Sequence, residues 1–197
     1  GLIAGPCHAE EVAREKLSYL TVACPDLSIA QIVADAMATR YIRVRISEDV
    51  VGAELAAVLK NIYAIGAGIA TGLGYGDNFL SVLISNASQE MKRFLAAVHE
   101  HDRDVKESAY LGDLLVTAYS PHSRNRTLGM MIGKGYSVKG AIIEMNMVAE
   151  GFNGSNGTFH LNQKFTVDMP IADSVYRILH ERMSPVIEMR LLTEQLA

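Results

Sequence analysis

Residues 54–77 read ELAAVLKNIYAIGAGIATGLGYGD, and Lys60 is the only charged residue between Glu54 and Asp77. The pattern predicts a helix over residues 54–67 that is buried on nearly every side. Buried lysines are rare, because an ammonium group taken out of water costs several kcal/mol unless it is paired or neutralised. A lysine whose pKa is lowered in such a setting can accept a proton near neutral pH. A lysine that reaches back to the surface is equally compatible with this composition.

The overall composition is that of a globular protein. The 197 residues are 49% hydrophobic and 20% charged, which is enough for one or two domains with a core. The net charge of −4 offers no basic excess for nucleic acid or an anionic membrane, so we expect neither as a partner. The two cysteines, Cys7 and Cys24, do not make a disulfide framework and indicate a reduced, cytoplasmic protein.

The chain shows no signal-peptide pattern, since no basic start leads into an apolar run and a small-residue cleavage site. The longest apolar run, residues 61–76, is rich in glycine and falls short of the roughly 18 to 20 residues of a membrane span. The chain starts at Gly1 without a methionine, which is typical of a cloning scar or of a chain cut from a longer protein.

Residues 1–47 alternate expected strands and helices, which is an α/β pattern. A β-rich run at residues 19–24 ends at a Pro-Asp turn, and residues 41–46 alternate apolar and basic side chains as a half-exposed edge strand does. Ser28 is the expected cap of the helix between them, whose apolar residues at helical spacing are Ile29, Ile32, Val33 and Ala36.

From residue 48 onward the chain is expected to be helical, with only a weak strand signal near residues 166–167. Further helices are predicted over residues 78–101, 113–119, 139–151, 171–180 and 185–196. The stretch SPHSRNRTLG, residues 120–129, is interpreted as a polar loop. We therefore expect a mainly α protein with an α/β piece at residues 1–47 and an all-helical domain at residues 48–197.

Two glycine patterns resemble nucleotide-binding loops without meeting their requirements. GLGYG at residues 72–76 is not G-x-G-x-x-G, and it follows a helix instead of a strand. GMMIGKG at residues 129–135 has one residue too few between its first glycines for a phosphate loop and lacks the final Ser or Thr. Turns and close helix packing are the better interpretation of both. The two histidines of residues 99–101 would face different ways on a helix, so we expect no metal.

Two short groups of polar residues have the chemistry of a binding site. Asp113 and Thr117 are four apart and so share one helix face. Ser123, Arg124 and Asn125 offer a hydroxyl, a planar bidentate donor and an amide, which suit a phosphate or a carboxylate. Taken alone, each group is more often structural.

Taken together and in order, these segments resemble the NAD(P)-dependent sn-glycerol-3-phosphate dehydrogenases of bacteria. The resemblance rests on GPCHAEEVA, VGAELAAVLKNIYAIGAGIATGLGYGDN, LGDLLVTAYSPHSRNRTLG, EMNMVAEG and MPIADSVYRIL, and it covers essentially the whole chain. It implies a helical substrate domain of the 6-phosphogluconate-dehydrogenase-like type, preceded by the last part of a Rossmann domain. The rest of that domain is expected upstream, so this chain alone is expected to be inactive.

The resemblance also implies roles for individual residues. Lys60 would exchange a proton with the C2 oxygen as sn-glycerol 3-phosphate and dihydroxyacetone phosphate interconvert with NAD(P), supplying phospholipid precursors. The implied substrate-binding residues are Gly5, Cys7, Asn61, Asp113, Thr117, Ser123, Arg124 and Asn125. The resemblance also implies that the Asp113 carboxylate supports the lysine. The implied cofactor-binding residues are Ala9, Arg124, Val148 and Glu150.

The chain departs from the family pattern at two places. Cys7-His8 stands where the family has a Ser/Thr-Phe pair, which puts a hydroxyl contact to substrate in doubt. Residues 152–157, FNGSNG, replace the usual start of a helix, and each glycine weakens a helix by up to about 1 kcal/mol. We expect these residues to form a flexible loop on the cofactor side.

Two other functions stay open at this point. A related two-domain dehydrogenase would act on a different hydroxy acid, although SRNR at residues 123–126 favours a phosphorylated substrate. A non-catalytic helical module for dimerisation would use the apolar helices but would leave Lys60 unexplained. The same helices lead us to expect a homodimer. The residues that choose between NAD and NADP would lie upstream.

Overall fold

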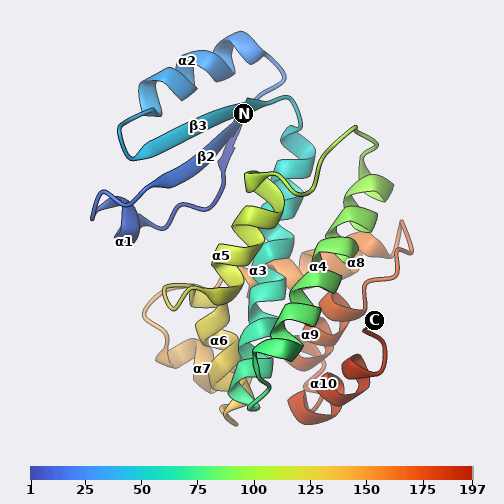
Figure 1. Ribbon diagram of the computed structural model, residues 1–197. Coiled ribbons are helices and arrows are strands. Elements are labelled where there is room, and N and C mark those ends of the chain that lie inside the picture. The colour runs from blue at the N-terminus through green and yellow to red at the C-terminus, as the bar shows by residue number, and fades with distance from the viewer. Residues whose placement is uncertain (197) are drawn as a thin grey trace.

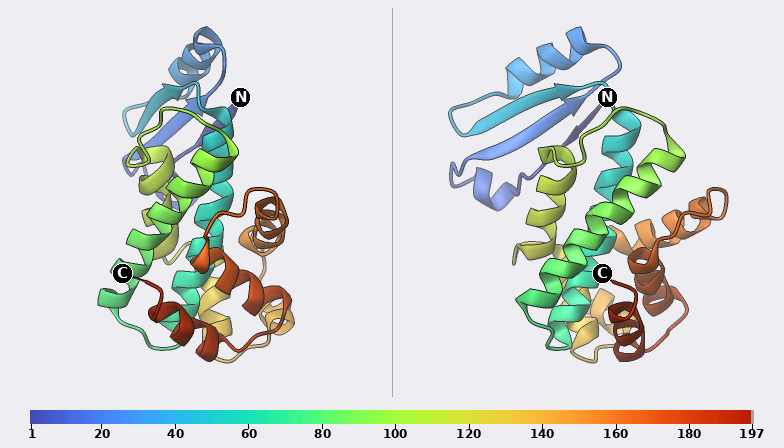
Figure 2. Two further views of the ribbon diagram at one scale, coloured as in Figure 1. Left: turned by 90° about the vertical axis from the view of Figure 1, so that its right-hand side faces the viewer. Right: turned by 45° about the vertical axis from the view of Figure 1, so that its right-hand side comes forward.

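The computed structural model describes residues 1–196 as a small α/β layer at one end of a bundle of helices (Figures 1 and 2). The layer consists of β1 (Leu2–Ala4), α1 (Ala9–Val12), β2 (Ser18–Ala23), α2 (Leu27–Met37) and β3 (Ile42–Ser47). The strand order is β1-β2-β3, with β1 antiparallel and β3 parallel to β2. Figure 1 shows α2 on the outer side of the sheet and the bundle on the other.

The bundle is built around α3 (Val50–Gly72), which contacts helices on several sides. The other elements are α4 (Asp77–Val98), a π-helical turn η1 (Ser108–Gly112), α5 (Asp113–Tyr119), α6 (Arg124–Gly133), α7 (Val138–Glu144), α8 (Gly151–Asn162), α9 (Pro170–His180) and α10 (Pro185–Thr193). No strand follows β3 within the described part of the chain. The prediction of a mainly α protein is therefore confirmed.

The α/β layer agrees with the sequence in outline and differs in detail. The two predicted strands are confirmed as β2 and β3, each within one residue, whereas β1 has no counterpart in the sequence analysis. The predicted cap of α2 is wrong, because Asp26 occupies the cap position and accepts a hydrogen bond from the Ser28 amide at 2.9 Å. The small residues Ala30 and Ala34 let α2 lie close to β2, so Ile32 stays exposed despite its helical spacing.

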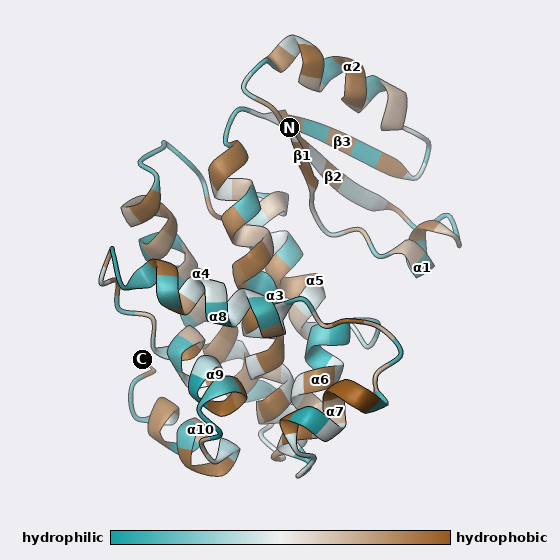
Figure 3. Cartoon of the chain, turned by 180° about the vertical axis from the view of Figure 1, so that it is seen from behind, coloured by the Kyte–Doolittle hydropathy of each residue, from teal (hydrophilic) through white to brown (hydrophobic). Residues whose placement is uncertain are grey.

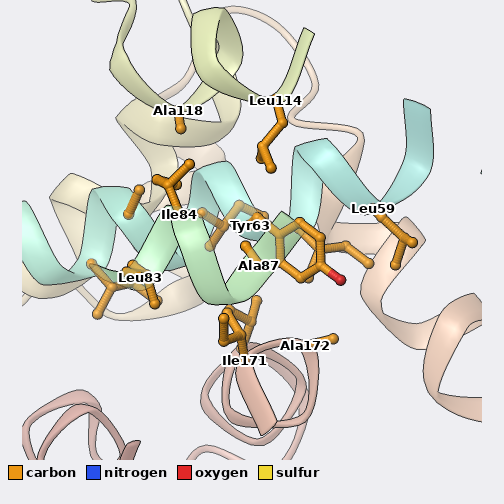
Figure 4. Packing of buried hydrophobic residues seen from close by; sticks show 14 of the residues in the cluster. Leu59, Tyr63, Leu83, Ile84, Ala87, Leu114, Ala118, Ile171 and Ala172 are labelled. Carbon is orange, nitrogen blue, oxygen red and sulfur yellow. The ribbon is translucent and has the colours of Figure 1, made fainter. Parts of the chain in front are cut away.

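The main core confirms the prediction of a helix buried on nearly every side. Of the 23 residues in α3, 14 are buried. Figure 4 shows Tyr63 of α3 in the middle of this core, with Leu114 and Ala118 of α5 on one side and Ile171 and Ala172 of α9 on the other. Met91 and Phe94 of α4 are buried in the same cluster, as the amphipathic pattern of that helix predicts.

Glycines set the short distance between α3 and α6. A Cβ atom at Gly68 or Gly72 of α3 would collide with the backbone of α6, and a Cβ atom at Gly129 or Gly133 of α6 would collide with the backbone of α3. The turn after each helix uses a glycine with positive φ. The interpretation of both glycine patterns as turns and close helix packing is confirmed.

Three boundaries in the helical part correct the sequence analysis. The predicted polar loop at residues 120–129 is wrong in its second half, because α6 begins at Arg124. The predicted flexible loop at residues 152–157 is also wrong, because these residues lie within α8. The helix predicted over residues 139–151 ends at Glu144, and residues 145–150 connect it to α8. In α6 and α8, packing against α3 outweighs the low helix propensity of glycine, serine and asparagine.

By length and composition alone, α3 is long and apolar enough to cross a membrane, which corrects the shorter run expected from the sequence. In the fold, 61% of its most apolar stretch is buried inside the protein. Central helices of compact domains meet the same criteria, and the surrounding helices account for the apolar character of this one.

A buried ion pair fixes the start of α3 at the junction with the α/β layer. Asp49 caps the helix by accepting from the Gly52 amide at 3.0 Å, and Arg103 donates to both carboxylate oxygens at 2.7 and 3.0 Å. The Tyr110 hydroxyl donates to the same carboxylate at 2.6 Å. Burial raises the pKa of Asp49, but these hydrogen bonds outweigh burial and hold the pKa well below its usual range. The domain boundary between residues 47 and 48 stays a prediction.

Candidate active site

Lys60 lies on α3 and is paired with a carboxylate from α5. Its Nζ donates to Oδ2 of Asp113 at 2.6 Å. The Lys60 side chain is 19% exposed and that of Asp113 only 3%. The ammonium group is therefore taken largely out of water, and the carboxylate offsets the cost of that burial. The alternative of a lysine that reaches back to the surface fits this largely buried and paired side chain less well.

The Asp113 carboxylate has one further close donor, the backbone amide of Gly5, which donates to Oδ2 at 3.2 Å. The Thr117 hydroxyl donates to the Asp113 backbone carbonyl at 2.6 Å and lies 3.4 Å from Oδ1. Gly5 has φ +132°, and a Cβ atom there would lie 2.7 Å from the Tyr19 carbonyl oxygen, so a glycine is needed for this approach. Because Gly5 follows β1, the partner of the lysine is tied directly to the α/β layer.

The start of α6 supplies the second group of polar side chains. Ser123 caps the helix, and its hydroxyl accepts from the Arg126 amide at 3.2 Å. Asn125 is buried, and its Oδ1 accepts from the Gly151 amide at 2.9 Å. Within residues 1–196, no hydrogen bond uses the Asn125 Nδ2 group or the Arg124 guanidinium group. These donors, together with the positive end of a helix, suit an anion.

The start of α8 closes the site against α3. The Asn61 amide nitrogen lies 3.5 Å from a carboxylate oxygen of Glu150, which is a long contact at the limit of a hydrogen bond. A Cβ atom at Gly151 would lie 2.7 Å from the Asn61 carbonyl oxygen and 2.8 Å from its carbon. Only a glycine lets α8 begin this close to Asn61.

These groups surround one polar cavity of about 220 Å³. It is lined by His8, Ala57, Lys60, Asn61, Thr117, His122, Ser123, Arg124, Asn125 and Glu150. A larger groove of about 710 Å³ lies beside α7 and α9, but its lining is mostly apolar and contains no carboxylate. The small cavity therefore brings Lys60 and the polar start of α6 together.

The structure brings most of the expected site residues together and leaves two outside. Gly5 and Asp113 lie directly behind Lys60 through their hydrogen bonds. Cys7 lies near the same carboxylate. Burial raises the pKa of the Cys7 thiol, a hydrogen bond with Ser18 lowers it, and the negative charge of Asp113 raises it. Ala9 is exposed on α1 and does not line the cavity. Val148 is 67% exposed and lines a neighbouring pocket instead.

Two histidines of the cavity wall are absent from the sequence-based site. His8 follows the β1 segment, and His122 immediately precedes the cap of α6. His8 stood out in the sequence only as a departure from the family pattern, and His122 carried no signal. Both become visible once the α/β layer is placed against the bundle.

Within residues 1–196, no group of three or more His, Cys, Asp or Glu side chains is placed to hold a metal ion. The helix end at residues 99–101 has its two imidazole rings 6.1 Å apart, without further ligands from such residues.

The chain thus combines a small α/β layer with a helical bundle, and a paired lysine and the polar start of α6 line one cavity. A model of the family described as NAD-dependent glycerol-3-phosphate dehydrogenase C-terminus matches residues 49–189. The chain belongs to this family.

Named relatives agree with this assignment. The chain is 42% identical over 180 residues to a glycerol-3-phosphate dehydrogenase (NAD(P)+) of Chlorobium phaeobacteroides, which covers 91% of this chain and 54% of the relative. A Listeria monocytogenes protein of the same name is 41% identical over 91% of this chain and 53% of its own length. The crystal structure of glycerol-3-phosphate dehydrogenase from Coxiella burnetii superposes with a TM-score of 0.94 at 32% identity, covering 98% of this chain and 59% of that one. The chain thus spans about half the length of the relatives it matches.

Proposed function

We propose that the protein containing this chain interconverts sn-glycerol 3-phosphate and dihydroxyacetone phosphate with NAD(P)(H), in the supply of glycerophospholipid precursors. The observation that carries the proposal is the shared cavity of Lys60 and the α6 start, which offers a proton acceptor and an anion site within one small space. The names of the relatives give glycerol 3-phosphate as the substrate and NAD(P)+ as the cofactor of those proteins.

Lys60 is the proposed base. In the oxidation of sn-glycerol 3-phosphate its amine takes the proton of the C2 hydroxyl, and in the reverse direction its ammonium returns that proton to the carbonyl oxygen. Asp113 holds Nζ at 2.6 Å, and the hydrogen bond from the Gly5 amide keeps the carboxylate in place. Residues of the α/β layer and of the helical bundle therefore position the proposed base.

The start of α6 is the proposed phosphate site. Arg124 offers a planar pair of donors, and Asn125 has its oxygen occupied by the Gly151 amide, which leaves the Nδ2 group for the substrate. Ser123 orders the first turn through its cap. This arrangement favours a phosphorylated substrate over another hydroxy acid.

The polar groups of the cavity are also compatible with binding part of NAD(P). The exposed guanidinium group of Arg124 suits a dinucleotide phosphate, and Glu150 beside Asn61 suits hydroxyl or amide donors. When bound, the cofactor supplies the hydride acceptor and donor. Contacts from Ala9 and Val148 remain part of the proposal, since both residues are exposed and free to meet a cofactor, although neither lines the cavity.

We also propose that the protein is a cytoplasmic homodimer. The support for association is a set of exposed apolar side chains on α7, the segment after it and α10, namely Ile142, Ile143, Met147, Val148, Val186 and Ile187. Figure 3 shows hydrophobic colour on α7 and α10. Sedimentation of the full-length protein at micromolar concentration tests this, and a monomer would contradict it.

Arg124→Ala in the full-length enzyme tests the proposed function. Loss of charge-assisted hydrogen bonds should raise KM for dihydroxyacetone phosphate roughly 10- to 100-fold. KM for unphosphorylated dihydroxyacetone should change far less. Arg190→Ala, on the distant helix α10, is the matched control. Equal effects of Arg124→Ala on the two substrates would remove the phosphate role.

A further inference from the structure

His8 and His122 face each other across the boundary between the α/β layer and the bundle. Their ring centroids lie 6.2 Å apart with the planes at 61°, which is an edge-on contact. Both line the cavity that contains Lys60 and Arg124. His8 is the only lining residue that comes from the α/β layer, and the other nine come from α3 and the elements after it.

The Nε2 atom of His8 is buried and has no hydrogen-bond partner within the described residues. A buried polar atom without a partner costs about 1 to 3 kcal/mol, so such atoms usually meet a ligand or a solvent molecule. The His8 side chain does not serve as a helix cap either, although the residue stands at the cap position of α1. Nothing in the fold therefore uses this nitrogen.

The charges around His8 favour an anion as its partner. The lining contains the cations Lys60 and Arg124 and one carboxylate, Glu150, which lies beside Asn61. Lys60 is already paired with Asp113, so Arg124 is the lining cation that no carboxylate neutralises within residues 1–196. His122, the ring next to His8, directly precedes the serine that caps α6. His8 thus lines the same cavity as Arg124 and the start of α6.

We propose that His8 binds the phosphate group of the substrate, donating a hydrogen bond from Nε2, and that the edge of His122 positions its ring. This inference rests on the proposed function. The phosphate would then be held from the bundle by Arg124 and Asn125 and from the α/β layer by His8. Substrate binding would then link the α/β layer to the helical bundle beside Lys60, in addition to the hydrogen bond from the Gly5 amide to Asp113.

Three substitutions of one residue in the full-length enzyme test the proposal. His8→Phe keeps an aromatic ring against His122 but has no donor. It should raise both KM for dihydroxyacetone phosphate and Kd for inorganic phosphate about tenfold, with kcat within twofold and KM for dihydroxyacetone unchanged. His8→Gln places an amide nitrogen near the Nε2 position and should restore most of the affinity. His8→Asn is too short to do so and is the matched control.

Unchanged phosphate affinity in His8→Phe would overturn the proposal, and so would an equal loss with dihydroxyacetone. Failure of His8→Gln to restore affinity beyond His8→Asn would overturn the assignment to Nε2. Phosphate Kd is measured by titration calorimetry and needs no turnover. A protein that binds phosphate through His8 but does not oxidise sn-glycerol 3-phosphate would lose the proposed function while keeping the phosphate site.

Discussion

Replacing Gly151 by alanine should destabilise the protein, whereas the same change at Gly157 in the same helix should stabilise it. Gly151 starts α8 against α3, where a Cβ atom would lie 2.7 Å from the Asn61 carbonyl oxygen, 2.8 Å from its carbon and 2.8 Å from Ile65 Cδ1. Gly157 lies in the exposed part of α8, with nothing within 4 Å of an added Cβ atom. The pair therefore separates packing from helix propensity.

The contacts give the expected magnitudes. The 2.7 Å approach is about 0.7 Å shorter than the 3.4 Å at which ordinary contact begins, and the obstacle is backbone of α3 that cannot rotate away. Overpacking of this kind costs about 1 to 3 kcal/mol, and weakening the bond from the Gly151 amide to Asn125 adds about 1 kcal/mol. The propensity gain of about 1 kcal/mol leaves a net loss of about 1 to 3 kcal/mol. Gly157→Ala keeps only the gain.

Urea unfolding of the 197-residue chain, followed by circular dichroism, measures both changes. The slope of free energy against urea should match the wild type in each variant, so that the midpoints report stability. In the full-length enzyme, Gly151→Ala should also lower kcat/KM, because displacement of α8 moves Glu150 away from Asn61. Two alanine variants that stabilise alike would refute the close approach of α8 to α3.

Two further predictions concern buried carboxylates. Burial raises the pKa of Glu90 to about 7 from its ordinary 4.5, although the amides of Ile171 and Ala172 donate to it at 2.9 and 3.0 Å. Between pH 4.5 and 7 the folded chain binds a proton that the unfolded chain releases, so the free energy of unfolding should fall by roughly 3 kcal/mol as the pH rises. When unfolding is measured at pH 5, 6 and 7, the Glu90→Gln variant should show a smaller fall. Asp113→Asn leaves the Lys60 ammonium without its carboxylate, which should lower stability by about 2 to 4 kcal/mol. In urea unfolding, the loss should shrink when Lys60→Met is combined with it, and additive losses would argue against the pair.

The pattern of residues could predict the buried helix and its lysine, whereas only the family resemblance pointed to Asp113 as the partner of the lysine. Lys60 stood out because no other charge lies near it along the chain. Its partner Asp113 is 53 positions away, on a helix whose orientation depends on the packing of α3 against α5. The spacing of four residues predicted that Asp113 and Thr117 share one face of a helix, but it could not predict which part of the protein that face contacts.

Glycine caused the largest errors in secondary structure. Gly129 and Gly133 in α6 and Gly151 and Gly154 in α8 argue against helices by propensity. In the fold these residues allow α6 and α8 to approach the backbone or side chains of α3, and that packing outweighs the loss. The polar start of α6 lines the cavity, and its Ser123 caps the helix, a start signal that the interpretation of residues 120–129 as a polar loop overlooked. His8 and His122 had no pattern of their own, because their meeting depends on how the two layers sit together.

The most direct test of Lys60 as the base is turnover by the full-length enzyme with Lys60→Met, which keeps the length of the side chain and removes the amine. The account predicts that kcat falls by about 100- to 10,000-fold, while the Kd values for NADH and inorganic phosphate stay within a few-fold of the wild type. Lys134→Met, at the exposed end of α6, should leave kcat unchanged. Wild-type turnover in Lys60→Met would contradict the account.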